Sequence, residues 1–239
     1  MKQKWLLILA VIALVLPARA GYAVTLFDWS LNLNDMLISA PDFYSGPDAG
    51  QLPSFVDDSV FDWGTGLGAI TIAYNPGAAG DYFIGSFFDH EIDNAVNTYF
   101  NEYGSVAGTP AAGQSWEIDE PGWGYGDILT NFQASSLDNS NAIDGSFVDD
   151  TSMAMGWNFS LGAGETALIH VYLSDQLPED IFYLEHIDPD SASSFYFYSD
   201  MDIAGGAAPV PEPGTFMLLG VGLAGIAGLG GRKGTLRFL

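Results

Sequence analysis

The sequence of 239 residues predicts a mainly β protein, with one β-sandwich or jelly-roll-like domain and one short helix. Short runs of β-branched and aromatic residues are separated at close spacing by Gly, Asn, Asp, Ser and Pro. This pattern is typical of antiparallel sandwiches and disfavours alternating βαβ units. The high aromatic content also excludes a disordered stalk. We therefore expect a packed all-β domain, flanked by two apolar segments of different character.

The N-terminal segment has the layout of a secretory signal peptide. Two lysines precede the apolar run Trp5–Leu16, Pro17 interrupts it, and Ala18–Ala20 offers small residues to a signal peptidase. An apolar run of twelve residues is too short for a permanent membrane helix. We expect cleavage after Ala20, with Ala23 as the second candidate.

The clearest strands lie on either side of a Gly-rich turn at Leu161–Glu165, and we expect them to form a hairpin. The residues expected on its buried face are Met153, Met155, Trp157, Phe159, Ala167, Ile169, Val171 and Leu173. Further strands are expected at Val24–Leu31, Gly66–Tyr74, Asp81–Phe88, Ile128–Phe132, Ile181–Glu185 and Phe195–Ile203.

One segment predicts a helix over 89–104. Ile92, Val96 and Tyr99 follow helical spacing, Asp89 can cap the start, and Gly104 can end the helix. We expect this helix to cover one end of the sandwich.

The charges are divided sharply between the domain and the ends of the chain. All six Lys and Arg residues lie outside Gly21–Pro211, a stretch that holds 29 of the 30 acids, so its net charge is near −29. Nucleic acid is excluded as a partner because nothing in the domain could neutralise phosphates. The absence of cysteine excludes disulfides and thiolate sites.

Ca²⁺ is the only cofactor that the acidic composition suggests. Side-chain oxygens gather at short spacing in three acidic turns, one of which is Asp149–Asp150. The candidate ligands in the other two turns are Asp138, Asp144, Asp188 and Asp190. The alternative is that these are solvated turns, because Asp is a turn former in any case.

The segment around Glu117 and Asp119 resembles the Glu-x-Asp-x-Glu strand of laminarinase-like glycoside hydrolases. That resemblance implies two carboxylates converging on one strand face. Here the third acid is Glu120, directly after Asp119, and Pro121 follows. In a regular strand Glu120 points to the opposite face, so we assign no catalytic residue and expect a strand end running into an acidic turn.

Aromatic residues offer a sugar-binding alternative. Trp63, Trp116, Trp123 and Tyr125 could stack on sugar rings, although strand tryptophans in a sandwich are usually buried. Trp123 lies between glycines and is the best exposed candidate.

The C-terminal segment combines three features in a fixed order. Pro211, Glu212 and Pro213 precede the uncharged run Gly214–Gly231, which is long enough to cross a bilayer. The basic residues that follow are Arg232, Lys233 and Arg237, and they would remain in the cytoplasm.

This tail resembles the PEP-CTERM sorting tail. In that family the tripeptide is recognised by a membrane-embedded exosortase, in Gram-negative bacteria that make extracellular polysaccharide. The preceding domain looks like the uncharacterised domains found with such tails, so the resemblance implies no activity.

Four parts are therefore expected: a signal peptide at 1–20, an acidic β-sandwich domain at 21–204, a linker with the sorting motif at 205–213, and a membrane helix with a basic tail at 214–239. We expect a non-enzymatic protein, exported across the inner membrane and anchored as a precursor. Its mature form would have a structural or adhesive role at the cell surface or in extracellular polysaccharide. The rival interpretation is a carbohydrate-active protein using Glu117 or exposed aromatic residues. Expected partners are signal peptidase, exosortase and the membrane.

Overall fold

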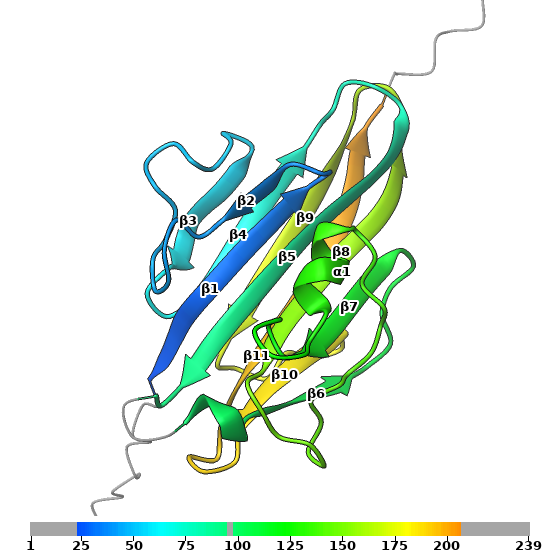
Figure 1. The fold of residues 1–239 in the computed structure, drawn as a ribbon. Helices are drawn as coiled ribbons and strands as arrows, with labels where there is room; N and C mark the ends of the chain where they lie inside the picture. Colours follow the sequence, from blue (N-terminus) through cyan, green and yellow to red (C-terminus); the bar gives the residue numbers. More distant parts are fainter. Residues whose placement is uncertain (1–22, 95–97, 207–239) are drawn as a thin grey trace, which may run out of the picture.

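The computed structural model describes residues 23–94 and 98–206, which form two antiparallel sheets packed face to face (Figure 1). Sheet A has the strand order β2 (Leu37–Ser39), β1 (Val24–Leu33), β5 (Gly80–Ile92), β8 (Ser152–Leu161) and β7 (Gln114–Asp119). Sheet B has the order β3 (Val56–Asp62), β4 (Leu67–Tyr74), β9 (Glu165–Ser174), β11 (Ser193–Gly205), β10 (Tyr183–Asp188) and β6 (Tyr103–Ala107). The prediction of a mainly β sandwich is confirmed.

The core lies between the sheets and consists of the apolar residues that alternate along each strand. Trp29 and Phe88 from sheet A and Phe197 from sheet B are fully buried in it. Polar bonds also cross the core, among them one in which the Trp157 Nε1–H group donates to Ser199 Oγ at 2.8 Å. This bond satisfies an indole donor that burial would otherwise leave without a partner.

The expected hairpin around Leu161–Glu165 is wrong in its pairing, although its buried face is right. β8 belongs to sheet A and β9 to sheet B, so the turn crosses from one sheet to the other. The predicted inward residues of both strands do lie in the core. Alternation specifies which face is buried, but a strand pair across the core shows the same alternation as a hydrogen-bonded hairpin.

The expected helix over 89–104 is also wrong. β5 continues to Ile92, a short 3₁₀ helix covers Tyr99–Asn101, and β6 begins at Tyr103. Phe88 and Ile92 face the core while Asp89 and Glu91 lie on the opposite face, which is the period of a strand. Pairing with β1 and β8 therefore outweighs the local helical spacing. Val96 lies outside the described residues.

The segment Ile128–Phe132, expected as a strand, belongs to the helix α1 (Ile128–Gln133), which covers the outer face of sheet A (Figure 1). Ile128 and Phe132 lie one helical turn apart and pack with Phe87, Leu137 and Ala154 in a second apolar cluster. The remaining predicted strands are present with longer or shifted ends, because β1, β4, β10 and β11 overlap the expected ranges.

The described chain begins and ends at opposite ends of the sandwich (Figure 1). The Ala23 carbonyl accepts a hydrogen bond from Asp93 N–H, beside the last residue of β5. Gly205 pairs with Glu165, while Gly80 at the start of β5 pairs with Leu161 at the other side of the same turn. Gly206 therefore lies at the end of the molecule remote from Glu91.

The expected signal peptide at 1–20, the tripeptide Pro211–Pro213 and the expected membrane helix at Gly214–Gly231 lie outside the described residues. Within the part of the chain that the structure describes, no helix is both long and apolar enough to cross a membrane.

Candidate functional site

Acidic side chains form a row across the outer face of sheet A. Asp28 of β1 pairs with Asp89 of β5, Asp89 pairs with Ser152 of β8, and Ser152 pairs with Asp119 of β7. Directly paired residues project to the same side of a sheet, so these carboxylates lie on one face. Loops cover most of this face, and several of the carboxylates are buried beneath them.

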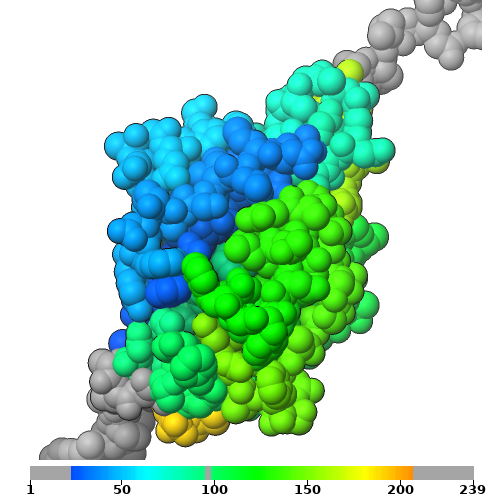
Figure 2. All heavy atoms as spheres, viewed as in Figure 1, coloured from blue at the N-terminus to red at the C-terminus, as the bar shows by residue number. Residues whose placement is uncertain are grey.

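A pocket of about 610 Å³ opens beside this row, and Phe27 and Glu120, the sequence neighbours of Asp28 and Asp119, line it. It is lined by seven aromatic residues, four acidic residues, an asparagine and a glycine: Phe27, Phe43, Tyr44, Tyr99, Phe100, Trp123, Tyr125, Glu91, Glu120, Asp149, Asp150, Asn94 and Gly124. Figure 2 shows the face on which the N-terminal segments, in blue, meet the green segments around residues 100–150. We call this feature the aromatic pocket.

The loop 121–126 is folded around a single carboxylate. Glu120 is 5% exposed and accepts hydrogen bonds from five consecutive backbone N–H groups, those of Gly122 to Gly126, at 2.9 to 3.1 Å. Burial disfavours the charged form, but the backbone hydrogen bonds outweigh it and lower the pKa of Glu120. The Gly126 Cα lies so close to the loop's start that an added Cβ would overlap the Glu120 carbonyl oxygen.

This loop presents its aromatic side chains to solvent. Trp123 is 64% exposed and meets the Phe43 ring edge-on at 5.6 Å between centroids. Tyr125 donates its hydroxyl hydrogen to Asp149 Oδ2 at 2.6 Å. Phe27 stacks on Phe43 at 4.6 Å. Two chain segments far apart in sequence thus build one continuous aromatic wall.

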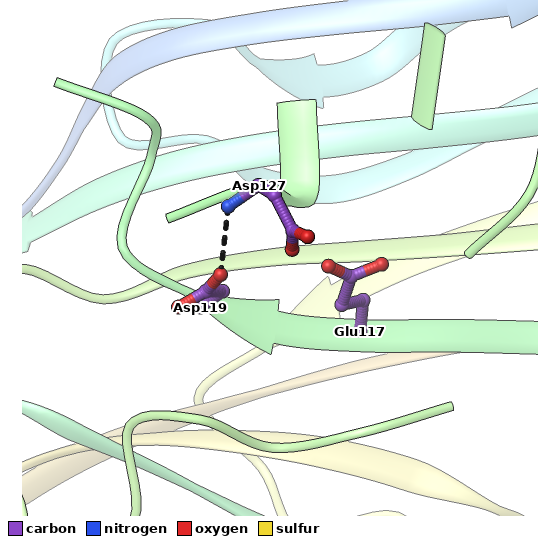
Figure 3. Close-up of side chains that lie close together, drawn as sticks. All are labelled: Glu117, Asp119 and Asp127. Atoms are coloured by element: carbon purple, nitrogen blue, oxygen red, sulfur yellow. Dashed lines mark hydrogen bonds between the residues drawn. The ribbon is translucent and has the colours of Figure 1, made fainter. Parts of the chain in front are cut away.

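A second group of acids lies at the β7 side of sheet A (Figure 3). Carboxylate oxygens of Glu117, Asp119 and Asp127 all lie within 4.8 Å of one another. The Asp127 N–H donates to Asp119, and the Asn131 Nδ2 group donates to both Glu117 and Asp127. The three carboxylates are close enough to ligate one cation together.

Glu117 is not at the surface of the aromatic pocket. It is 1% exposed, with its oxygens accepting from Asn131 on α1 and from the Asp138 N–H. Burial raises the pKa of Glu117 to about 7, despite these two hydrogen bonds. The paired acids that a glycoside hydrolase needs are therefore present near Glu117, but they lie under α1 and away from the lining of the aromatic pocket.

The four aspartates predicted as calcium ligands stay in three separate turns. Asp138 and Asp144 each accept a hydrogen bond from the backbone two residues ahead, and Asp188 accepts from the N–H groups of Asp190 and Ser191. The carboxylates of Asp138, Asp144 and Asp188 thus cap their own turns. A calcium site there stays a prediction.

The four aromatic candidates divide between core and surface. Trp63 and Trp116 pack against the core, whereas Trp123 and Tyr125 line the aromatic pocket. Sequence reasoning missed Phe27, Phe43 and Glu91, because only the fold brings them beside Trp123. The glycines on either side of Trp123 were the one local signal for this site.

Replacing Glu120 by Gln should release the loop. An amide offers one acceptor oxygen and turns an NH₂ group toward other donors, so the five N–H groups cannot all be satisfied. We expect hydrogen exchange of the amides at 122–126 to accelerate at least about tenfold. This factor corresponds to a decrease of about 1.4 kcal/mol in the free energy of local opening. Glu165→Gln is the control, since Glu165 caps a turn at the opposite end of the sandwich. Unchanged exchange in Glu120→Gln would contradict this role.

The raised pKa of Glu117 predicts a pH dependence of stability. The folded protein keeps this proton up to a pH of about 7, whereas the unfolded chain loses it near 4.5. The contribution of this proton to the free energy of unfolding is therefore full below pH 4.5 and is lost as the pH rises through 7. The loss is at most roughly 3 kcal/mol.

Glu117→Gln should reduce the difference in the free energy of unfolding between pH 5 and pH 8. Urea denaturation in EDTA measures it, with the exposed Glu179→Gln as the control. A variant with the wild-type difference would show that the proton on Glu117 does not contribute.

The comparisons with known proteins concern the end of the chain. A family model described as the PEP-CTERM protein-sorting motif matches residues 209–233. No curated protein and no solved structure matches the chain. The matched segment contains Pro211, Glu212 and Pro213, the tripeptide that the sequence predicted as the recognition element. The motif is the recognition signal for exosortase and implies export with C-terminal sorting. The chain therefore carries a PEP-CTERM protein-sorting motif near its C-terminal end.

Proposed function

We propose that the acidic domain is a non-catalytic carbohydrate-binding module, with an adhesive role in the cell envelope or in extracellular polysaccharide. The observation that carries this proposal is the aromatic pocket, in which seven aromatic side chains and four carboxylates surround one cavity. Aromatic faces stack on the C–H faces of sugar rings, and carboxylates accept hydrogen bonds from sugar hydroxyl groups.

The position of the pocket supports this role. The sorting motif follows Gly206, whereas the pocket lies beside Glu91 at the other end of β5. Glu91 lies eleven positions after Gly80 along β5, a distance of roughly 35 Å. A domain tethered through its C-terminal end would therefore direct the pocket away from the membrane.

The charge of the domain selects among glycans. A net charge near −29 repels polymers rich in uronate or sulfate. Neutral glycans, or glycans with amino sugars, are therefore the class that the pocket favours. Glycoside hydrolysis is the rival function, but the pocket lining contains neither Glu117 nor Asp119. Glu120, which does line it, has its carboxylate oxygens occupied by backbone N–H groups.

Trp123→Ala tests the proposal directly. Loss of the exposed indole should weaken binding of a neutral glucan or chitosan oligosaccharide at least about tenfold, or 1.4 kcal/mol, in isothermal titration calorimetry. Tyr172→Ala is the matched control, because Tyr172 lies on the outer face of sheet B, stacked on Tyr198.

Equal binding by Trp123→Ala and the wild type would show that the aromatic pocket does not bind the saccharide. If the wild type releases reducing ends from the saccharide and Glu117→Gln does not, the glycoside hydrolase function is favoured instead.

The sorting motif gives a second experiment. We propose that exosortase processes the precursor near Pro211–Pro213, with partner and site following from the matched motif. Intact mass with cell fractionation should find a mature species from Gly21 to this tripeptide in the native host. Replacing Pro211, Glu212 and Pro213 by alanine should leave a membrane-bound species that retains Arg237. A wild-type protein that retains Arg237 would contradict processing and leave a plain anchored domain.

A further inference from the structure

One acidic side chain of the aromatic pocket is buried without a partner for one of its oxygens. Glu91 is 4% exposed and lines the pocket, and among the described residues its Oε2 atom has no hydrogen-bond partner. A buried carboxylate oxygen that accepts no hydrogen bond is unfavourable. The pocket is the side from which a ligand can reach Glu91 and supply the donor.

A second acid of the pocket lining lies beside Glu91 and has the same property. Asp150 Oδ1 is a buried atom without a partner in the described part of the chain. Asp150 lies two residues before Ser152, which pairs with Asp89, and Glu91 lies two residues after Asp89. Burial raises the pKa of Glu91 to about 8, and the charges of Glu102 and Asp150 contribute to the increase. The two pocket carboxylates therefore lie close enough to disfavour each other's negative charge.

No side chain of the domain supplies a positive charge to this side of the pocket. The domain contains no Lys or Arg. His186 contacts the buried Glu102, and His170 forms its ion pair on the outer face of sheet B. Burial lowers the pKa of His90 to about 3, so this ring is neutral. A positive charge beside Glu91 would therefore have to come from a ligand.

The arrangement suits an organic cation better than a bare metal ion. In the described chain, three carboxylates close enough to ligate one metal ion occur only at Glu117, Asp119 and Asp127. An ammonium group needs less, because one carboxylate can accept its hydrogen bonds while aromatic faces attract its charge. The aromatic pocket offers both kinds of group around one cavity.

The aromatic wall of the pocket runs from Trp123 to the neighbourhood of Glu91. Phe27 stacks on Phe43, which contacts Trp123, and Phe27 also meets the Tyr44 ring edge-on with 4.9 Å between centroids. Burial raises the pKa of the Tyr44 hydroxyl, and the charge of the nearby Glu91 raises it further. A sugar stacked on this wall would therefore bring a ring substituent to the Glu91 carboxylate.

We propose that the aromatic pocket selects sugars with a protonated amino group, and that Glu91 accepts hydrogen bonds from this ammonium. The inference rests on the proposed carbohydrate binding and names its substrate class, the amino sugars, in place of neutral glycans. The aromatic rings stack on the sugar and attract its positive charge. Asp150 adds to the attraction without contacting the amine.

Binding of the ammonium is expected to displace a proton from Glu91. Free Glu91 keeps its proton up to a pH of about 8, and a bound cation favours the ionised form. The titratable groups that act on Glu91 or on which it acts are Glu102, Asp150 and Tyr44 from other segments, and Asp89 from its own strand. All but Tyr44 are acids, so none of them supplies the positive charge that would ionise Glu91 without the ligand.

Three trisaccharides that differ in the group at C2 of each ring test the inference. They are chitotriose with an ammonium, its N-acetylated form with an acetamide, and cellotriose with a hydroxyl. Isothermal titration calorimetry of the purified protein at pH 6.5, where the sugar amine is protonated, should show that chitotriose binds at least about tenfold more tightly than the other two. Buffers of different ionisation enthalpy should show release of up to about one proton with chitotriose alone.

Glu91→Gln should reduce the affinity for chitotriose to that for cellotriose and abolish the release of the proton. Its unchanged affinity for cellotriose would show that the variant folds. Glu165→Gln is the matched control, because it removes the same charge at the opposite end of the sandwich, and it should keep the preference. If Glu91→Gln folds poorly, Asp150→Asn gives a second readout, with chitotriose bound at least about threefold more weakly and cellotriose unaffected.

Equal affinity of the wild type for the three trisaccharides would overturn the inference and leave the carbohydrate-binding proposal intact. An unchanged preference in Glu91→Gln would also overturn it, since chitotriose would then be attracted by the overall negative charge of the domain. Lysine amide bound as tightly as chitotriose would show recognition of an alkylammonium group, as on a protein, and not of an amino sugar. Binding of none of the three trisaccharides would contradict the proposed function itself.

Discussion

The constraint on which this structure depends is the absence of any positively charged Lys or Arg side chain in a domain with 29 acids. Ordinary proteins compensate buried carboxylates with these side chains, and here other groups must do so. Glu120 uses five backbone N–H groups, and Glu102 uses a histidine and a backbone N–H. Glu117 keeps a proton to near-neutral pH. Backbone N–H groups, a histidine and a retained proton thus take the place of Lys and Arg around these buried carboxylates.

The same constraint connects stability to binding. The loop held by Glu120 carries Trp123, so the compensation of one buried charge also fixes an exposed aromatic ring beside Phe43. Asp89, two residues before the pocket residue Glu91, lacks such compensation among the described residues. Acids that are unfavourable for the isolated domain therefore surround the cavity where a ligand would enter. Preorganised aromatic and polar groups around one cavity are typical of small-molecule sites.

The sandwich determines the direction in which this cavity points. β5 runs from the end near Gly206 to the end at Glu91, and the turn between β8 and β9 lies at the former. A turn that joins the two sheets, rather than a hairpin within one sheet, lets β8 pair with β5 and β9 pair with β4 and β11. Glu91 of β5 and the aromatic pocket consequently lie at the end remote from Gly206.

The sequence by itself determined the architecture class, the strand faces, the acidic domain and the sorting motif. These depend on composition, on period-two alternation and on a short linear motif, all of which are local. Only the tertiary structure decided the partners of β8 and β9, the strand continuation at Asp89–Ile92, and the helix at Ile128–Gln133. It also brought Phe27 and Phe43 beside Trp123. Strand pairing and burial join residues far apart in the chain, and their energies outweigh the local preferences that a sequence displays.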